Sequence, residues 1–312
     1  MNEFELIARL TRSLPTNDST VVGAGDDCAL IDLGIPDRWV LFKTDAVVEG
    51  VHFTKTAAPE KIGRKALARC LSDVSAVAGT PTHALVTLAL PASFDAGFVE
   101  AIYAGMKALA ARHGVAIVGG ETTTNPERML IAVSVLGTVG KGKSPLRSGA
   151  RAGDAIFVTG ELGGALSGKH LEFEPRLAEA RWLAGHFSIH AMIDLSDGLA
   201  GDLRHILNSS QVGAELLSGA IPISHAAKSA ARAGSSPRPP LLAALSDGED
   251  FELLFTVAPG DAVALIDAWK QQFPELRLSC IGRIDAGSDL TIRDRKGVQP
   301  LAVHGYVHFQ ES

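Results

Sequence analysis

The chain has 312 residues, 46% of them hydrophobic, and a net charge of −6, which fits a globular protein with two domains. The acidic balance and the dispersed Lys and Arg residues argue against a nucleic-acid-binding or anionic-membrane-binding surface. The three widely spaced cysteines argue against a disulfide framework and a zinc knuckle, and they fit a reducing, cytoplasmic location. The lack of an apolar run of about 18 residues argues against a membrane span.

The first half of the sequence alternates strand-like and helix-like segments. Strands are predicted by β-branched, alternating or long apolar runs at 41–53, 83–90, 115–118 and 129–139. Helices are predicted by apolar residues at helical spacing, at 60–78 and 94–113. We interpret Gly119-Gly120-Glu121 as a turn, and the run at 129–139 as compatible with a sheet edge buried between two protomers. This half is expected to be an α/β or mixed α+β domain.

A change in composition marks the expected domain boundary. Residues 140–153 are rich in Gly, Lys and Arg, so we divide the chain into domains 1–146 and 147–312. The second domain is also expected to be mixed α/β, with strands near 155–159, 191–194, 251–257 and 278–284. Residues 224–240, rich in Ala, Ser and Pro, are expected to form an exposed helix end and a loop.

Five short stretches place acidic residues beside glycine: 25–27, 44–50, 119–121, 194–198 and 247–250. Any one of them is more often an ordinary turn than a ligand. Ionised carboxylates are costly to gather without compensation, so their repetition beside short apolar runs predicts bound hard cations. Mg²⁺ fits best, because it takes a few carboxylates and leaves positions for phosphate oxygens. The sequence therefore predicts a multi-metal phosphate site.

One phosphate-binding motif is contradicted by its context. Residues 137–144 satisfy the P-loop pattern G-x-x-x-x-G-K-[ST] and follow a predicted strand. A P-loop requires a helix that opens at its Gly-Lys-Ser, but Pro145 follows directly and no apolar helical periodicity lies behind it. We therefore reject the P-loop. The same loop supplies Arg147, a planar cation able to hold phosphate oxygens unless it is simply solvated.

The motifs taken together resemble, in order and along essentially the whole chain, those of thiamine-monophosphate kinases. They are Gly25–Ala29, Thr44-Asp45 with His52-Phe53, Leu71–Asp73, Gly119-Gly120, Arg147–Ala150 with Gly153-Asp154, Asp194–Gly198, Gly248–Leu253 and Gly305-Tyr306. These kinases belong to the aminoimidazole ribonucleotide synthetase superfamily and are unrelated to P-loop kinases. The resemblance implies two α/β domains with ATP in the cleft between them. It also implies a homodimer joined through the N-terminal sheets, and a C-terminal domain that completes the ATP and substrate site.

The resemblance further implies roles for individual residues. Several Mg²⁺ ions would be held by Asp27, Thr44, Asp45, Asp73, Glu121, Asp194 and Asp197. ATP would be contacted by Thr44, Tyr103, Gly120, Arg147 and Ser196, and thiamine monophosphate by His52, Glu249 and Tyr306. Catalysis would rest on Asp45, Asp197 and Arg147. The implied reaction is ATP-dependent phosphorylation of thiamine monophosphate to thiamine diphosphate.

This chemistry agrees with the residues present. Phosphoryl transfer needs mainly positioning and charge neutralisation. The acceptor phosphate has a second pKa of roughly 6, so its oxygen is already ionised at neutral pH and no protein general base is required. We therefore expect direct in-line transfer without a phospho-enzyme, which explains many carboxylates without an evident His-Asp or Ser-His pair.

Several residues have competing interpretations. His52 between Val51 and Phe53 could be a hydrogen-bonded core residue, and Tyr306 could cap the core or stack on a cationic substrate ring. Asp26 is expected to orient its turn or to stay solvated.

Three departures from the family pattern leave open an altered metal number, weaker activity or a different acceptor. They are Glu121 in place of Asp, Lys43 in place of Ser or Thr, and Asp247 in place of Gly. Two alternatives remain. One is another ATP-using member of the superfamily, for which Cys28 sits too close to Asp27 to be a persuasive nucleophile. The other is a non-catalytic nucleotide- or thiamine-phosphate-binding relative.

Overall fold

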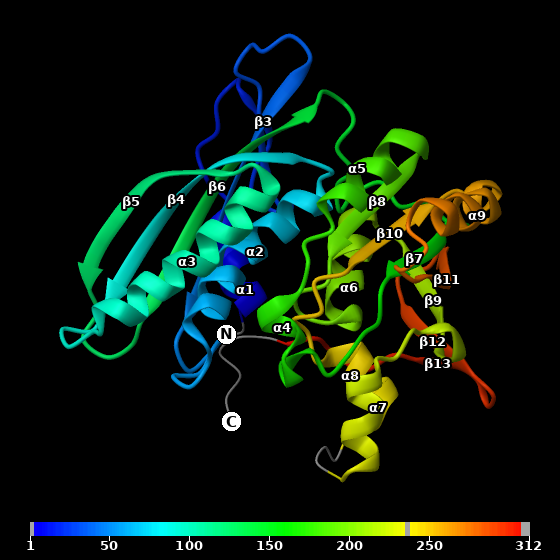
Figure 1. The fold of residues 1–312 in the computed structure, drawn as a ribbon. Helices are drawn as coiled ribbons and strands as arrows, with labels where there is room; N and C mark the ends of the chain where they lie inside the picture. Colours follow the sequence, from blue (N-terminus) through cyan, green and yellow to red (C-terminus); the bar gives the residue numbers. More distant parts are fainter. Residues whose placement is uncertain (1–2, 235–237, 307–312) are drawn as a thin grey trace.

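The computed structural model describes residues 3–234 and 238–306, which form two α/β halves, each built on its own sheet (Figure 1). Within these ranges, no helix combines the length and the apolar character that a membrane crossing needs. Cys28, Cys70 and Cys280 are free thiols, as their spacing predicts.

The N-terminal half contains a six-stranded sheet of order β1-β2-β3-β6-β4-β5. Its strands are β1 (Thr20–Val22), β2 (Ala29–Ile31), β3 (Arg38–Val48), β4 (Thr80–Leu90), β5 (Ala116–Thr124) and β6 (Leu130–Gly140). Its helices are α1 (Glu3–Thr11), α2 (Pro59–Ala76) and α3 (Ala96–His113). Only β4 and β5 pair in parallel, because α3 connects them as a crossover. Helices α2 and α3 pack on one face of this sheet (Figure 1).

The C-terminal half contains a seven-stranded sheet of order β13-β12-β9-β11-β7-β10-β8, in which only β9 and β12 are parallel. Its strands are β7 (Ala155–Thr159), β8 (Ile189–Asp194), β9 (Gly213–Leu217), β10 (Leu253–Val257), β11 (Leu278–Asp285), β12 (Leu290–Asp294) and β13 (Gly297–Pro300). Its α-helices are α4 (Lys169–Glu172), α5 (Leu177–His186), α6 (Leu199–Ser210), α7 (His225–Arg232), α8 (Pro240–Ser246) and α9 (Ala262–Gln272). Single 3₁₀ turns lie at Ala165–Ser167, Ser218–Ala220 and Pro259–Asp261.

Local sequence signals define helices α2 and α3 of the N-terminal half. Pro59 occupies the first turn of α2, where a missing N–H costs nothing. The Asp95 carboxylate accepts a hydrogen bond from the Gly97 amide at 2.8 Å and caps α3. Gly114 ends α3 in the left-handed conformation, with φ of 67°.

Helices α2 and α3 approach so closely that their contact requires glycine. A Cβ atom on Gly63 of α2 would lie 1.8 Å from the carbonyl oxygen of Ile102 in α3. A Cβ atom on Gly105 of α3 would lie 1.8 Å from the carbonyl oxygen of Glu60. This backbone contact fixes the position of α2, the helix that carries several of the site residues.

The hydrophobic cores join the two halves along α2. The core between the N-terminal sheet and its helices also includes Phe173, Leu177 and Phe251 from the C-terminal half. The rings of Phe173 and Phe251 stack with their centroids 4.0 Å apart. Helix α2 contacts α4, α5 and β8 as well as its own sheet, so it is the element shared by both halves.

Most of the predicted elements are confirmed. The segments 60–78 and 94–113 form α2 and α3, and 83–90 lies within β4. In the second half, 155–159 matches β7, and the predicted strands near 191–194, 251–257 and 278–284 overlap β8, β10 and β11.

Three expectations about strands are wrong. Strand β3 ends at Val48, because the amides of Val51 and His52 turn back to its carbonyl group. The Gly119-Gly120-Glu121 stretch is not a turn but part of β5. The predicted strand at 129–139, which is β6, cannot form a sheet edge, because β3 and β4 pair with it on both sides.

Candidate functional site

Three buried carboxylates from distant parts of the chain meet between the two halves. Asp27 precedes β2, Asp73 lies on α2 and Asp194 ends β8. One oxygen from each lies within 4.8 Å of the others. We call these three residues the acidic triad; all three are implied as metal ligands by the family resemblance.

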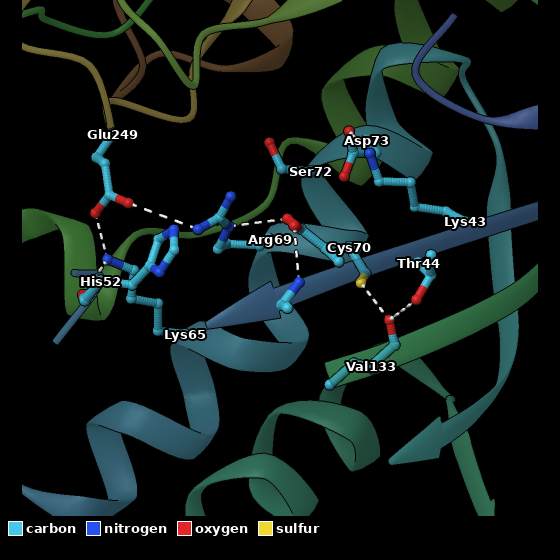
Figure 2. Close-up of polar contacts among 12 residues, drawn as sticks. Lys43, Thr44, His52, Lys65, Arg69, Cys70, Ser72, Asp73, Val133 and Glu249 are labelled. Carbon is cyan, nitrogen blue, oxygen red and sulfur yellow. Dashed lines mark hydrogen bonds and ion pairs between the residues drawn. The ribbon is translucent and has the colours of Figure 1, made fainter. Parts of the chain in front are cut away.

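Among the described residues, a different side chain donates to each carboxylate of the acidic triad. Arg147 donates to Asp27 at 2.6 Å, Lys43 donates to Asp73 at 2.8 Å, and the Ser72 hydroxyl donates to Asp194. Figure 2 shows Lys43 and Ser72 beside Asp73. The sequence departure at Lys43 therefore places an ammonium directly among the predicted ligands.

The acidic triad still has capacity to bind a cation. Oδ2 of Asp27 is buried and has no hydrogen-bond partner among the described residues. Burial raises the pKa of Asp194 to about 6, with Asp27 adding to the shift. Burial also raises the pKa of Asp73, although Lys43 opposes the rise. Three buried carboxylates, two of them with charged forms that burial disfavours and one with an unpaired oxygen, fit a hard divalent cation that would supply the missing positive charge.

A second group of residues lines a cavity beside the acidic triad. We call it the interdomain cavity, and its lining is Val51, His52, Arg69, Leu166, Ser196, Asp197, Asp247, Glu249, Phe251 and Tyr306. The three residues implied as contacts of thiamine monophosphate, His52, Glu249 and Tyr306, therefore share one cavity. The loop after Asp194 brings Ser196 and Asp197 to the same place.

Glu249, which lines the interdomain cavity, is held by Lys65 and His170. Lys65, fully buried on α2, binds the Glu249 carboxylate and donates to the carbonyl oxygen of His52 at 2.6 Å. His170 Nδ1 lies 3.0 Å from Glu249 Oε2. Burial would raise the pKa of Glu249, but His170 and Lys65 outweigh it and lower this pKa to about 2. Glu249 is therefore a fixed anion (Figure 2).

His52 is neutral and oriented by the backbone. Its Nδ1 accepts a hydrogen bond from the Val48 amide at 3.0 Å, which leaves the proton on Nε2. Burial and the nearby Arg69 lower the pKa of His52 to about 4. The hydrogen-bonded interpretation of His52 is thus correct, and it is compatible with a place in the cavity wall.

The remaining predicted residues lie on neighbouring elements. Asp45 on β3 accepts a hydrogen bond from Arg69 at 2.9 Å. Thr44 donates to the Val133 carbonyl oxygen at 3.3 Å, and Figure 2 shows this contact. Tyr306 is positioned by its amide, which donates to the carbonyl oxygen of Asp197 at 2.8 Å.

Tyr103, Gly120 and Glu121 lie away from the lining of the interdomain cavity. Tyr103 is on α3, and the other two are exposed on the edge strand β5. A Cβ atom at Gly120 would lie 1.7 Å from the Val86 carbonyl oxygen, so glycine is needed there for strand pairing. Nothing in the contacts of these three residues connects them with the acidic triad.

Several smaller expectations are resolved by the geometry. Asp26 orients its turn, since its carboxylate accepts hydrogen bonds from the amides of Asp27 and Arg147. Cys28 is buried, and burial raises its pKa, so it is no nucleophile. Asp247 adopts right-handed helical angles, and glycine is not required at that position.

The rejection of the P-loop is also confirmed. No helix opens between residues 141 and 154, all of which are described. Ser144 instead donates to the carbonyl oxygens of Val77 and Pro145.

Comparisons with known proteins agree on the whole chain. The AIR synthase related protein N-terminal domain matches residues 25–139, and the AIR synthase related protein C-terminal domain matches residues 151–295. A thiamine-monophosphate kinase of Rhodopirellula baltica is 40% identical over 307 residues, covering 96% of this chain and 93% of that protein. A thiamine-monophosphate kinase of Bacillus subtilis is 33% identical over 344 residues, covering 99% of this chain and 100% of that protein.

A solved structure shows the same likeness in three dimensions. AaThiL complexed with AMPPCP and TMP superposes with a TM-score of 0.81 at 30% identity, covering 99% of this chain and 97% of the other. Because the relatives match from end to end, over the same two domains that build the acidic triad and the interdomain cavity, this chain belongs to the thiamine-monophosphate kinase family of AIR synthase related proteins.

Proposed function

We propose that the chain transfers the γ-phosphoryl group of ATP to thiamine monophosphate, giving ADP and thiamine diphosphate. The observation that carries this function is the adjacency of the acidic triad and the interdomain cavity. They are joined by α2, which contributes Asp73 to the first and Arg69 to the second, and by the loop from Asp194 to Asp197. A site that binds metal-bound phosphates thereby lies next to one that binds a second substrate.

The transfer is a direct displacement. An oxygen of the acceptor phosphate forms a bond to the γ-phosphorus, and the bond from that phosphorus to the oxygen bridging to the β-phosphate breaks. The electron pair leaves with ADP. Because the acceptor oxygen is already ionised, with a second pKa of roughly 6, no proton must be removed by the protein. His52 is neutral, because its pKa is about 4. The proton on its Nε2 serves as a hydrogen-bond donor and is not transferred to the substrate.

Mg²⁺ is the proposed cofactor, held by the acidic triad together with Thr44, Asp45 and Asp197. Glu121, which the resemblance also implies as a ligand, lies exposed on β5 and would hold an ion apart from the acidic triad. The unpaired buried Oδ2 of Asp27 supports this assignment. The bound ions would neutralise and bridge the phosphates of ATP. Arg147, Ser196, Gly120 and Tyr103 are proposed to contact the nucleotide, and Arg147 is supported by its place beside Asp27.

The chemistry of the interdomain cavity suits thiamine monophosphate. Its thiazolium ring is a cation, and Glu249 is a permanently ionised carboxylate in the cavity wall. Tyr306 lines the same cavity and offers an aromatic face to a cation. His52 is proposed to donate from Nε2 to the substrate.

We also propose a homodimer through the uncovered face of the N-terminal sheet. The face opposite α2 and α3 exposes large apolar side chains on adjacent strands, namely Phe42, Leu85, Val118 and Leu136, each 41–59% exposed. A contiguous apolar sheet face of this kind is typical of a protein interface.

The proposed domain boundary stays at 146/147, in the segment between β6 and β7. The free thiols, two of which are buried, support the proposal of a reducing, cytoplasmic location.

The test is phosphorus NMR of the purified protein with ATP, Mg²⁺ and thiamine monophosphate. We expect thiamine diphosphate to appear one-for-one with ADP, and to be lost in the variants Asp45→Asn and Asp197→Asn. The exposed Asp18→Asn serves as the matched control and should retain activity. Consumption of ATP without thiamine diphosphate would favour another acceptor, and binding without turnover would favour a non-catalytic relative.

A further inference from the structure

A largely buried cation on α2, Arg69, connects the two parts of the site. Lys65, Arg69 and Asp73 are spaced four residues apart on α2, so they project from the same side of the helix. Lys65 reaches Glu249 in the interdomain cavity, and Asp73 belongs to the acidic triad. Arg69 lies between them and lines the interdomain cavity (Figure 2).

The contacts of Arg69 leave part of its guanidinium unused. Nε donates to Oδ2 of Asp45 at 2.9 Å. Nη1 is buried, lies 3.8 Å from Oε1 of Glu249, and has no hydrogen-bond partner among the described residues. A buried N–H group without a partner is costly, and it is satisfied when a ligand supplies an acceptor oxygen.

The charge of Arg69 is permanent and its position is fixed. Its side chain is only 15% exposed. Burial opposes the charge, but Asp45 and Glu249 outweigh burial and raise the pKa further. When Asp45 is committed to a metal ion, the positive charge of Arg69 faces the interdomain cavity without its main partner, and an anion is favoured there.

We propose that Arg69 is the clamp for the phosphate of the acceptor, an inference that rests on the proposed function. Its planar guanidinium binds oxygens of a phosphate monoester through Nη1 and holds the monoester with another oxygen facing the γ-phosphorus. Arg69 thereby distinguishes a phosphorylated acceptor from the corresponding free alcohol. The alternative is that Arg69 only neutralises Asp45, in which case it would affect both acceptors equally.

The test compares the binding of thiamine monophosphate and unphosphorylated thiamine by calorimetry, with Mg²⁺ and AMPPCP present. We expect Arg69→Met to weaken binding of the monophosphate by about 10- to 100-fold and binding of thiamine by less than about threefold. Arg69→Lys should be intermediate for the monophosphate, because an ammonium keeps the charge but not the planar fork. If Arg69→Met does not fold, the Arg69→Lys variant alone tests the clamp.

Arg64→Met is the matched control. Arg64 lies on the same helix, but it donates to the Glu172 and Phe173 carbonyl groups and to Glu174, outside the interdomain cavity. It should leave the preference for the monophosphate over thiamine unchanged. The proposed clamp is contradicted if both Arg69 variants keep the wild-type preference for thiamine monophosphate over thiamine. Formation of thiamine diphosphate by the wild-type protein, measured separately, shows whether the proposed function stands when the clamp fails.

Discussion

The ammonium of Lys43 lies 2.8 Å from Oδ1 of Asp73, inside the group of carboxylates that the proposed function assigns to metal ions. The side chains of Lys43 and Asp73 are 23% and 11% exposed. The pair is thus largely removed from water, and the protein supplies part of the positive charge that this group requires.

Replacing Lys43 by Met should make the protein depend on Mg²⁺ for stability. Without divalent ions, the variant should lose as much as about 3–5 kcal/mol of unfolding free energy, because Asp73 must either keep a buried charge without its partner or take up a proton. Millimolar Mg²⁺ should restore most of this loss. Urea unfolding in EDTA and in Mg²⁺ measures both values.

Lys141→Met is the control for this prediction. Lys141 pairs with Asp32 at a similar distance of 2.7 Å, but both side chains are about a third exposed. Loss of such a pair should cost about 0–1 kcal/mol and should not respond to Mg²⁺. An equal effect of the two substitutions would show that Lys43 has no special relation to the acidic triad.

Asp27→Asn should abolish the stabilisation of the protein by Mg²⁺. The substitution removes the anionic oxygen that is buried without a partner. The wild-type protein should gain about 3 kcal/mol of unfolding free energy at 100 times the dissociation constant of the ion, and the variant should gain almost nothing. Thermal unfolding across a Mg²⁺ series measures this, with the exposed Asp18→Asn as control. A variant that responds like the wild type would place the ion elsewhere.

The stability of the protein should decrease in acid because of Glu249. Its folded-state pKa of about 2 lies below the ordinary value of 4.5. Between these values the unfolded chain binds more protons, so stability is fully present above pH about 4.5 and is lost as the pH falls towards 2. The contribution is at most about 3 kcal/mol.

The measurement is urea unfolding of the wild type and Glu249→Gln between pH 3 and pH 6, the values bracketing the ordinary carboxylate range. The Gln variant should show a smaller decrease on acidification, whereas Glu100→Gln, on the exposed side of α3, should follow the wild type. Parallel curves for wild type and Glu249→Gln would mean that Lys65 and His170 do not hold the carboxylate ionised.

Leu85→Asp should convert the proposed dimer into a monomer. Leu85 lies in the middle of the apolar sheet face, and a buried charge there would be unpaired on both protomers. Sedimentation equilibrium measures the mass. Val263→Asp on α9, which is 71% exposed in the other half, should leave the mass unchanged. If the wild-type protein is already monomeric at high concentration, the proposed interface is contradicted.

The sequence predicts the long elements better than the short ones. Helices α2 and α3 and strand β4 are long and strongly periodic, so local pattern locates them. Helix α6 was missed, although Leu199, Leu203, Ile206 and Leu207 line one side of it, because it begins directly after the Asp-Gly stretch that reads as a turn. Strand β5 was cut short because two glycines suggest a bend, whereas here they permit close strand pairing.

The site residues also divide into those that a local sequence pattern can predict and those that it cannot. Asp27 and Asp194 can be found from the sequence because acidic residues beside glycine are visible there, whereas Asp73 has no glycine beside it and is implied only by the family resemblance. Lys65, Arg69 and His170 were missed, since cations at helical spacing usually face solvent. Their burial depends on Glu249, which is 184 residues beyond Lys65, and no local pattern can reveal a partner so distant. The four-residue spacing of Lys65, Arg69 and Asp73 on α2 is a signal that could have indicated Lys65 and Arg69, but not His170.

The stacking of Phe173 on Phe251 within the N-terminal core has a consequence for how the chain can be divided. A fragment cut after residue 146 would lack side chains that complete its own interior, and the remaining fragment would expose them to water. Neither half is thus a self-sufficient module that could be exchanged between proteins, and substitutions at this junction in one half constrain what the other can accept.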